Sequence, residues 1–201
     1  YRKMFNLGRK ELVIALLPGS RVGELKAHTD TLLETAQNLL EVHPDAKFLI
    51  PATNDNNMHF IKSRIRNNPT KNLKLIKGKV DEILNSANIA IAASGTASLQ
   101  IALHKKPMII IYKGSWISYF IWKMVRLIPN VSLPNILLNE NFVPEMLQHR
   151  ATPNLLSEKA CEIIKDKKYL KKIESKFNKL HKDLKKNTSS LIFKIIKPYL
   201  K

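Results

Sequence analysis

The sequence has one cysteine, no zinc motif and few acidic residues, and each shortage excludes a class of protein. The single Cys161 among 201 residues cannot form an intrachain disulfide, so a reducing cytoplasm fits best. No cysteine and histidine cluster has zinc-site spacing, and no pair of aspartates suggests another metal. The hydrophobic fraction of 44% argues against disorder. The length allows one domain with a proper core, or at most two small ones.

The shortage of acidic residues leaves a net charge of +18, which is unevenly distributed. Residues 159–201 hold 14 lysines against 4 acidic residues, whereas residues 1–158 hold 20 basic and 12 acidic residues. Lysines on a helical pattern are more typical of a solvated helix face than of a nucleic-acid site, so we predict no nucleic-acid partner. Attraction to an anionic membrane surface is a third interpretation, which we rank between a solvated helix face and a nucleic-acid site.

The stretch from Ile89 to Leu103 changes character twice within a few residues. Residues 89–93 form an uncharged apolar run, which predicts a strand covered on both faces. Ser94, Gly95 and Thr96 follow as a turn into a helix, and either hydroxyl could cap that helix. Free amides at such a corner attract an anion such as a diphosphate. Alternatively, the small residues serve only the tight turn.

A second corner of the same kind occurs earlier in the chain. Residues 11–17 form a buried-strand run that ends in Pro18-Gly19-Ser20-Arg21, and apolar residues then recur at helical spacing up to His43. Gly19 permits a close approach of the backbone, Ser20 could cap the helix, and Arg21 offers donors that suit phosphate oxygens. Glu24 falls in the first helical turn, where its charge favours the helix dipole.

Strands and helices alternate along the rest of the first 112 residues. Further strands are expected over residues 47–51, 73–76 and 108–112, with helices over 58–65 and 80–84. This pattern predicts an α/β fold, a Rossmann-like parallel sheet with helices on both faces. Pro134 indicates a loop over residues 131–135 that continues through 142–148. We divide the chain into a domain of residues 1–158 and a basic helical tail of residues 159–201.

The tail and the preceding aromatic segment leave alternatives open. Leucine, isoleucine and phenylalanine form one stripe at Leu170, Ile173, Phe177, Leu180 and Leu184, and a last apolar patch at Leu191, Ile192, Ile195 and Ile196. Such a stripe is typical of a core or subunit seam.

The aromatic segment of residues 113–138 contains Trp116, Tyr119, Phe120 and Trp122. It stays uncharged only over 114–122, which is too short for the ~20 residues of a membrane span. It could rest on a membrane surface or pack on protein.

Five short motifs follow one another in a specific order. They are Leu16-Leu17-Pro18-Gly19-Ser20-Arg21, Ala93-Ser94-Gly95-Thr96-Ala97, Lys106-Pro107-Met108, Ser132-Leu133-Pro134-Asn135, and Pro144-Glu145 with Leu147-Gln148. Together they resemble the second half of lipid-A-disaccharide synthase, a family of inverting glycosyltransferases with two Rossmann domains (the GT-B type). The resemblance extends from about residue 12 to about residue 156 and also covers the length of the helical tail.

The resemblance implies a reaction in lipid A biosynthesis, an early part of lipopolysaccharide synthesis. A diacylated glucosamine moves from UDP to the 6-hydroxyl of diacylglucosamine 1-phosphate, which gives lipid A disaccharide 1-phosphate and UDP. It implies a UDP-diacylglucosamine donor, a lipid acceptor, and a cytoplasmic enzyme peripheral to the inner membrane. Two helix N-termini and an arginine can stabilise the leaving diphosphate, so we expect no cofactor and no metal. Homo-oligomerisation stays open.

Site residues follow from the same motifs. The donor diphosphate is expected at Gly19, Ser20, Arg21, Ser94, Gly95 and Thr96. Gln100 stands where relatives commonly carry a glutamate that would hold the ribose, and an amide binds a diol without charge assistance. Asn135, Glu145 and Gln148 would line the donor-sugar side. The alternative is that Asn135 closes a turn and Gln148 lies on a solvated surface.

The resemblance places the acceptor site and the general base in a first domain that has no counterpart here. We therefore assign no catalytic residue, and we expect His28, His43, His104 and His149 to be surface or satisfied core residues. We expect a fragment or split product that is inactive alone. Two rivals remain: another UDP-sugar enzyme such as an epimerase, and a non-catalytic basic module that binds a membrane or nucleic acid.

Overall fold

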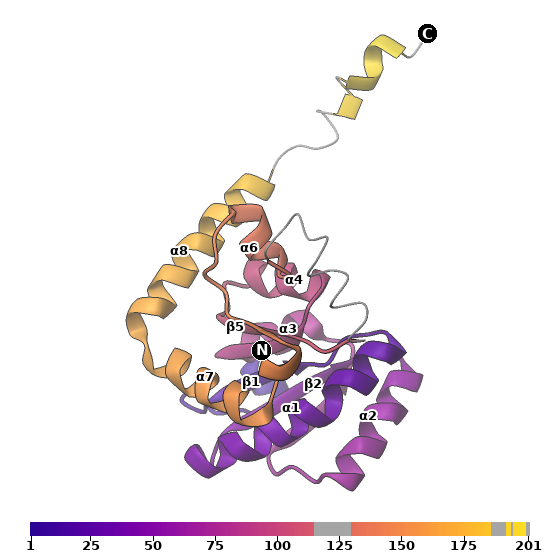
Figure 1. The fold of residues 1–201 in the computed structure, drawn as a ribbon, viewed down its shortest axis with the longest axis vertical. Coiled ribbons are helices and arrows are strands. Elements are labelled where there is room, and N and C mark those ends of the chain that lie inside the picture. The colour runs from indigo at the N-terminus through magenta and orange to yellow at the C-terminus, as the bar shows by residue number, and fades with distance from the viewer. Residues whose placement is uncertain (115–129, 186–191, 194, 200–201) are drawn as a thin grey trace.

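A six-stranded parallel sheet forms the centre of the protein (Figure 1). The structure is a computed structural model that describes residues 1–114, 130–185, 192–193 and 195–199. The strands are β1 (Val13–Leu17), β2 (Lys47–Ala52), β3 (Leu73–Lys77), β4 (Ile89–Ala93), β5 (Met108–Tyr112) and β6 (Glu145–Leu147). They lie in the order β3-β2-β1-β4-β5-β6, with every neighbouring pair parallel. The predicted Rossmann-like α/β class is confirmed.

Helices cover both faces of this sheet. One face packs against α1 (Val22–Val42), α2 (Asp55–Asn67) and α7 (Pro153–Lys165). The other face packs against α3 (Val80–Ser86), α4 (Thr96–Leu103) and α8 (Lys167–Leu184). The short α6 (Leu133–Leu138) contacts α4 and α8. The described residues also form the 3₁₀ turns η1 (Arg2–Phe5), η2 (Gln148–Arg150) and η3 (Lys197–Tyr199).

The central strands explain why their sequences lack charge. Every residue of β1 and of β4 is buried, because helices cover both faces of the sheet at these positions. The outer strand β3 is only partly covered, and it carries Lys74 and Lys77 at exposed positions. The strand covered on both faces that was predicted over residues 89–93 is confirmed, and the buried run expected over residues 11–17 forms a strand that begins at residue 13.

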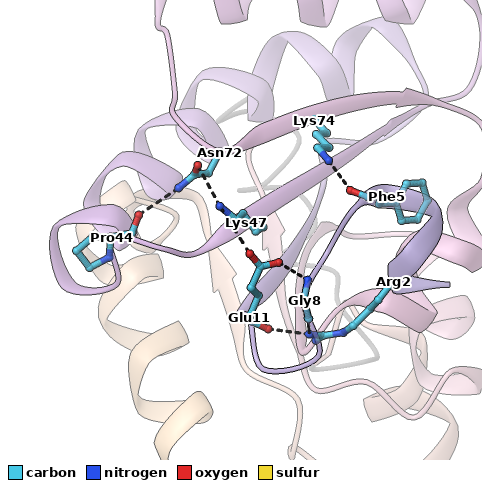
Figure 2. Close-up of polar contacts among 8 residues, drawn as sticks. All are labelled: Arg2, Phe5, Gly8, Glu11, Pro44, Lys47, Asn72 and Lys74. Carbon is cyan, nitrogen blue, oxygen red and sulfur yellow. Dashed lines mark hydrogen bonds and ion pairs between the residues drawn. The ribbon is translucent and has the colours of Figure 1, made fainter.

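The N-terminal segment is tied across the amino ends of the strands (Figure 2). The Arg2 guanidinium donates to the carbonyl oxygens of Gly8 at 2.9 Å and Glu11 at 2.9 Å, and to Asn88 Oδ1 at 2.8 Å. Glu11 also accepts from the Gly8 amide at 2.6 Å and lies 3.9 Å from the ammonium of Lys47. These contacts fix the start of the described chain at the edge of the sheet opposite to the carboxyl ends.

The loop expected over residues 131–148 contains two elements that the sequence analysis missed. Pro134 lies in the first turn of α6, where a missing amide hydrogen breaks no helical hydrogen bond. Residues 145–147 add the sixth strand beside β5. The loop prediction was wrong because a six-residue helix and a three-residue strand are too short to show a periodic pattern.

The helical tail packs onto the sheet domain along α8. Ile173, Phe177 and Leu180 are buried with the core that α3 and α4 form, whereas the side chain of Leu184 is 42% exposed. The predicted apolar stripe is thus a core contact over most of its length. Ile192 in the last apolar patch is exposed, as are residues 195 and 196, and residue 191 lies outside the described residues. The domain boundary after residue 158 falls within α7 and stays a prediction.

Two membrane-related findings bear on the sequence analysis. The aromatic residues Trp116, Tyr119, Phe120 and Trp122 lie outside the described residues, so the alternatives for their segment stay open. Among the helices that the structure describes, none combines the length and the hydropathy needed to span a membrane.

Two leucines of α8 give a matched test of this packing. We expect Leu180→Ala to lower the free energy of unfolding by about 2–5 kcal/mol, because it leaves a cavity between α8 and the sheet. Leu184→Ala changes the same side chain at an exposed position and should cost less than about 1 kcal/mol. Urea denaturation followed by circular dichroism measures both, and equal small losses would show that α8 does not contribute to the core.

Candidate functional site

The two predicted corners lie at the same edge of the sheet. β1 and β4 are neighbouring parallel strands, and Leu17 at the end of β1 lies opposite Ala92, one residue before the end of β4. The segments that follow, Pro18 to Arg21 and Ser94 to Thr96, therefore leave adjacent strands at their carboxyl ends. The strand order reverses between β1 and β4, and this is the place where open α/β sheets bind ligands.

Gly19 is required by its neighbour Glu24. Its φ is +108°, which residues with a side chain rarely adopt. A Cβ atom at Gly19 would lie 2.4 Å from Glu24 Oε2 and 2.5 Å from Glu24 Cβ. The sequence predicts that Gly19 lets the backbone approach a ligand, but the group that approaches Gly19 in the structure is the Glu24 side chain.

Glu24 holds the corner after β1 together. Its Oε2 accepts from the amides of Ser20 at 2.8 Å and Arg21 at 3.2 Å, and its Oε1 accepts from the Arg21 guanidinium at 3.0 Å. Burial raises the pKa of Glu24, but these hydrogen bonds outweigh it and the net pKa is lowered. Glu24 thus occupies two of the amides that we expected to bind a diphosphate. The Arg21 side chain remains 86% exposed.

The corner after β4 is more open. Gly95 has a φ of +152°, and a Cβ atom there would meet no described atom within 4 Å. No described residue accepts a hydrogen bond from the amides of Gly95 or Thr96. Ser94 is engaged instead, because its amide donates to Ile111 O and its hydroxyl to Val131 O, each at 2.9 Å. This corner offers donors to an anion.

The predicted serine and threonine caps are wrong. The N-cap of α4 is Gly95, which has no side chain, and the N-cap of α1 is Arg21 rather than Ser20. The hydroxyl of Ser94 donates to the carbonyl oxygen of Val131 instead of capping its own helix. Glu24 lies three residues after the N-cap Arg21, a position typical of a capping-box glutamate, and this spacing was the signal that could have identified its role.

Gln100 lies on α4 and is tied to α3. Its Nε2 donates to Asp81 Oδ1 at 2.8 Å, and the Nε2 of His104 lies 2.9 Å from the same oxygen. Hydrogen bonds from Gln100 and His104 lower the pKa of the exposed Asp81 carboxyl. The ribose contact of Gln100 stays a prediction, and in this arrangement its Nε2 already donates to Asp81.

Asn135 and Glu145 form the centre of a network that fixes residues 131–145. Glu145 accepts from the amides of Val131 at 2.9 Å and Ser132 at 3.0 Å, and from the Asn135 side chain at 2.8 Å. The buried Asn135 also donates to Val143 O and accepts from its amide, both at 2.9 Å. These contacts show that both side chains position the loop. Their predicted place on the donor-sugar side stays untested.

Gln148 is buried, so the alternative that it lies on a solvated surface is wrong. Its Oε1 accepts from the Gly114 amide at 3.2 Å, and its Nε2 donates to the Gly114 carbonyl at 3.3 Å. The residue holds a φ of +50°, which is uncommon for a residue other than glycine. Gln148 therefore clamps the chain just after β5, and its donor-sugar contact stays a prediction.

His28 was expected to be a surface or satisfied core residue, and it is a satisfied core residue. Its ring lies between the corner after β1 and the chain after β5, with Nδ1 3.2 Å from Pro18 O and Nε2 3.0 Å from the Lys113 amide. No sequence pattern indicated this bridge.

The chemistry of the assembled edge suits an anion. Within the described ranges, no three histidine, cysteine, aspartate or glutamate side chains are grouped to hold a metal ion. The described donors at the two corners include backbone amides and the Arg21 guanidinium, and such groups bind phosphate oxygens by hydrogen bonds that the phosphate charge strengthens.

Comparisons with known sequences converge on one family. A family model described as lipid-A-disaccharide synthetase matches residues 1–196. The lipid-A-disaccharide synthase of Dechloromonas aromatica is 38% identical over 192 residues, which cover 94% of this chain and 50% of that protein. The enzyme of the same name from Methylobacillus flagellatus is 34% identical and covers 100% of this chain and 53% of that protein. The chain thus spans about half the length of these curated relatives.

Solved structures share the fold at low sequence identity. The C-terminal CMP-Kdo binding domain of WaaA from Acinetobacter baumannii gives a TM-score of 0.60 at 9% identity, covering 92% of this chain and 94% of that one. UDP-GlcNAc 2-epimerase from Neisseria meningitidis, solved with UDP-GlcNAc bound, gives a TM-score of 0.55 at 15% identity, covering 86% of this chain and 41% of that one. Likenesses at this identity show the fold alone.

The network around Asn135 yields a stability prediction. Asn135→Asp replaces the amide that donates to Val143 O and Glu145 with an oxygen, so we expect a loss of about 2–4 kcal/mol in the free energy of unfolding at neutral pH. Asn141→Asp, the same change at an exposed position, should cost less than about 0.5 kcal/mol. Thermal denaturation of both variants measures this, and an unchanged melting temperature for Asn135→Asp would remove the positioning role.

Proposed function

The chain belongs to the lipid-A-disaccharide synthetase family, and from this membership we propose that it is the donor-binding half of a glycosyltransferase of lipid A biosynthesis. The complete enzyme transfers diacylated glucosamine from UDP to diacylglucosamine 1-phosphate. Because the chain spans about half the length of its relatives, we propose that the acceptor site and the general base belong to the other half. The chain alone then binds the donor nucleotide and transfers nothing.

The observation that carries this proposal is the pairing of the two corners at one edge of the sheet. In glycosyl transfer from UDP, negative charge grows on the diphosphate as the sugar bond breaks. Amides and a guanidinium already fixed at that position stabilise the developing charge without reorganisation. The β1 and β4 corners supply such groups, so the leaving diphosphate is the species that this edge stabilises.

The described contacts favour different roles for the six residues that are predicted to bind the diphosphate. Ser20 and Ser94 use their amides within the protein, and Gly19 makes room for Glu24. We therefore assign the diphosphate to Arg21 and to the amides of Gly95 and Thr96. Glu24 then acts through Arg21, because it holds the guanidinium at the corner while the rest of that group remains exposed.

We assign Gln100 to the ribose and the loop of Asn135, Glu145 and Gln148 to the donor-sugar side. The hydrogen bond from Gln100 to Asp81 leaves its Oε1 as the atom that can accept from a ribose hydroxyl. The other three residues shape the chain after β5 and before β6 rather than offering free groups. These three residues therefore contribute to sugar binding by holding the backbone in position, and not by a direct side-chain contact.

Membrane association follows from the nature of both substrates, which carry acyl chains. We propose that the protein works in the cytoplasm at the surface of the inner membrane, where α8 presents exposed lysines to anionic headgroups. These include Lys168, Lys171, Lys172, Lys179 and Lys182. Homo-oligomerisation stays an open alternative.

The rival functions are less well supported. Likeness to a UDP-GlcNAc 2-epimerase at 15% identity reflects a shared fold. A non-catalytic basic module would not need the paired corners. Joining the chain to the first half of the Dechloromonas aromatica enzyme and assaying disaccharide formation from the acylated substrates tests the transferase directly. Absence of product from a folded, UDP-binding hybrid would count against it.

UDP binding is the first measurable consequence. We expect UDP to raise the melting temperature of the chain, since a ligand that binds only the folded state stabilises it. Arg21→Ala should weaken UDP binding roughly 10- to 100-fold, the range for losing a charge-assisted hydrogen bond. Arg66→Ala removes an exposed arginine of α2 away from the corners and should leave the affinity unchanged. Equal UDP affinities in all three proteins, or none in any, would refute the assignment.

Vesicle binding tests the membrane proposal separately. We expect the chain to float with vesicles that contain phosphatidylglycerol but not with pure phosphatidylcholine vesicles. Replacing Lys171, Lys179 and Lys182 with glutamine should weaken this binding by about 1 kcal/mol per lysine. These residues share one exposed face of α8, so the fold should persist. Binding that is insensitive both to the lipid charge and to the substitutions would contradict the proposal.

A further inference from the structure

The ring of His28 connects the corner after β1 to the chain after β5, whose Lys113 lies 85 residues after His28 in the chain. Lys113 donates its amide hydrogen to His28 Nε2 at 3.0 Å, just after β5. His28 Nδ1 lies 3.2 Å from Pro18 O, at the start of the corner after β1. The side chain is buried, with 2% of the residue exposed, so water does not replace either partner.

The partners of the ring determine where its proton lies. An amide can only donate, so Nε2 must carry a lone pair, and a carbonyl can only accept, so Nδ1 must carry the hydrogen. The neutral tautomer with hydrogen on Nδ1 satisfies both. In the imidazolium both nitrogens donate, so Nε2–H would face the Lys113 amide hydrogen and the link to the chain after β5 would break.

The charged groups around the ring act in opposite directions. Among the described residues, Glu24 lies one turn earlier on α1 and favours the charged ring, whereas the Lys113 ammonium disfavours it. Burial is the largest influence and lowers the pKa of His28 below its usual 6.5. The Lys113 ammonium is itself held by the Thr31 hydroxyl at 2.7 Å, so its charge stays near the ring.

We propose that His28 is a positioning residue, which in its neutral form with hydrogen on Nδ1 locks the corner after β1 to the chain after β5. Gln148 holds the next residue, Gly114, by two hydrogen bonds. His28 therefore ties the chain after β5 to the Pro18 to Arg21 corner, while Gln148 ties the same chain to the end of β6. Protonation of the ring releases this link, and the corner that carries Arg21 loses its support.

The consequence for ligand binding rests on the proposed function, because it assumes that Arg21 contacts a diphosphate. On that basis, acidification weakens nucleotide-sugar binding through His28 without any change in the ligand. UDP-N-acetylglucosamine is the suitable probe, because its diphosphate is esterified at both ends and takes up no proton where histidine titrates. UDP itself has a terminal phosphate that would obscure the effect.

The test compares the unaltered chain with His28→Gln, and with His59→Gln as the matched control on an exposed histidine of α2. Glutamine can accept from the Lys113 amide but does not titrate. We expect the affinity of the unaltered chain and of the control to stay constant from about pH 8 to about pH 6.5 and to fall below it as the ring takes up its proton, by about fivefold once protonation is complete, at the lower end of couplings between linked sites. His28→Gln should lose this dependence. A pH dependence that survives in His28→Gln would overturn the proposal.

Two further measurements judge His28 even if no nucleotide sugar binds. Nitrogen-15 NMR of the histidine rings should show hydrogen on Nδ1 and none on Nε2 of His28 at neutral pH, and an Nε2–H tautomer would refute the bridge. Because the folded pKa lies below the unfolded one, stability is complete above about pH 6.5 and falls as the pH decreases below it. His28→Gln should flatten this fall relative to His59→Gln. If only nucleotide binding is absent, the donor-binding proposal fails and the bridge stands.

Discussion

The parallel pairing of β1 with β4 is the constraint on which the rest of the structure depends. It joins two halves of the chain whose crossovers run in opposite directions across the sheet, and it brings the carboxyl ends of residues 13–17 and 89–93 side by side. Both strands are buried along their whole length. A shift in their register would turn apolar side chains to the wrong face of the sheet and would also displace one corner relative to the other. The distance between Gly19 and Gly95 is therefore set by the sheet and not by the loops themselves.

Internal carboxylates and amides account for most polar groups around this edge. Glu24 holds the corner after β1, Glu145 holds the chain before α6, and Gln148 and His28 hold the chain after β5. Among the described residues of the two corners, donors remain on Arg21, where Glu24 holds one nitrogen of the guanidinium, and at the start of α4, where the amides of Gly95 and Thr96 are positioned by the backbone. Such preorganisation is the condition under which amides stabilise a developing anion most strongly.

Much of the fold could be predicted from the sequence, because strands that are buried on both faces are short uncharged runs of apolar residues. The strands at residues 89–93 and 108–112 were predicted with their observed bounds. The short α6 and β6 were missed because neither completes two periods of its pattern. The roles of Glu24 and His28 depend on partners brought together by folding, such as the Lys113 amide, and no local pattern encodes such a contact. Motif resemblance found the corners, but it could not show which amides were already occupied.

The two outer strands give the sheet a resistance to polymerisation. An uncovered strand can recruit a strand from another molecule, and this is a common route to fibrils. At one border of the described sheet, β3 carries the charged side chains of Lys74 and Lys77, the second of which is paired with Asp55, and charged side chains on an edge strand disfavour pairing with an apolar strand. At the other border, β6 spans three residues and directly follows Pro144, so it is too short to pair stably with a strand of another molecule. A parallel sheet of this kind folds slowly because its strands come from distant segments of the chain. Outer strands that pair poorly with other molecules reduce aggregation while the sheet is folding.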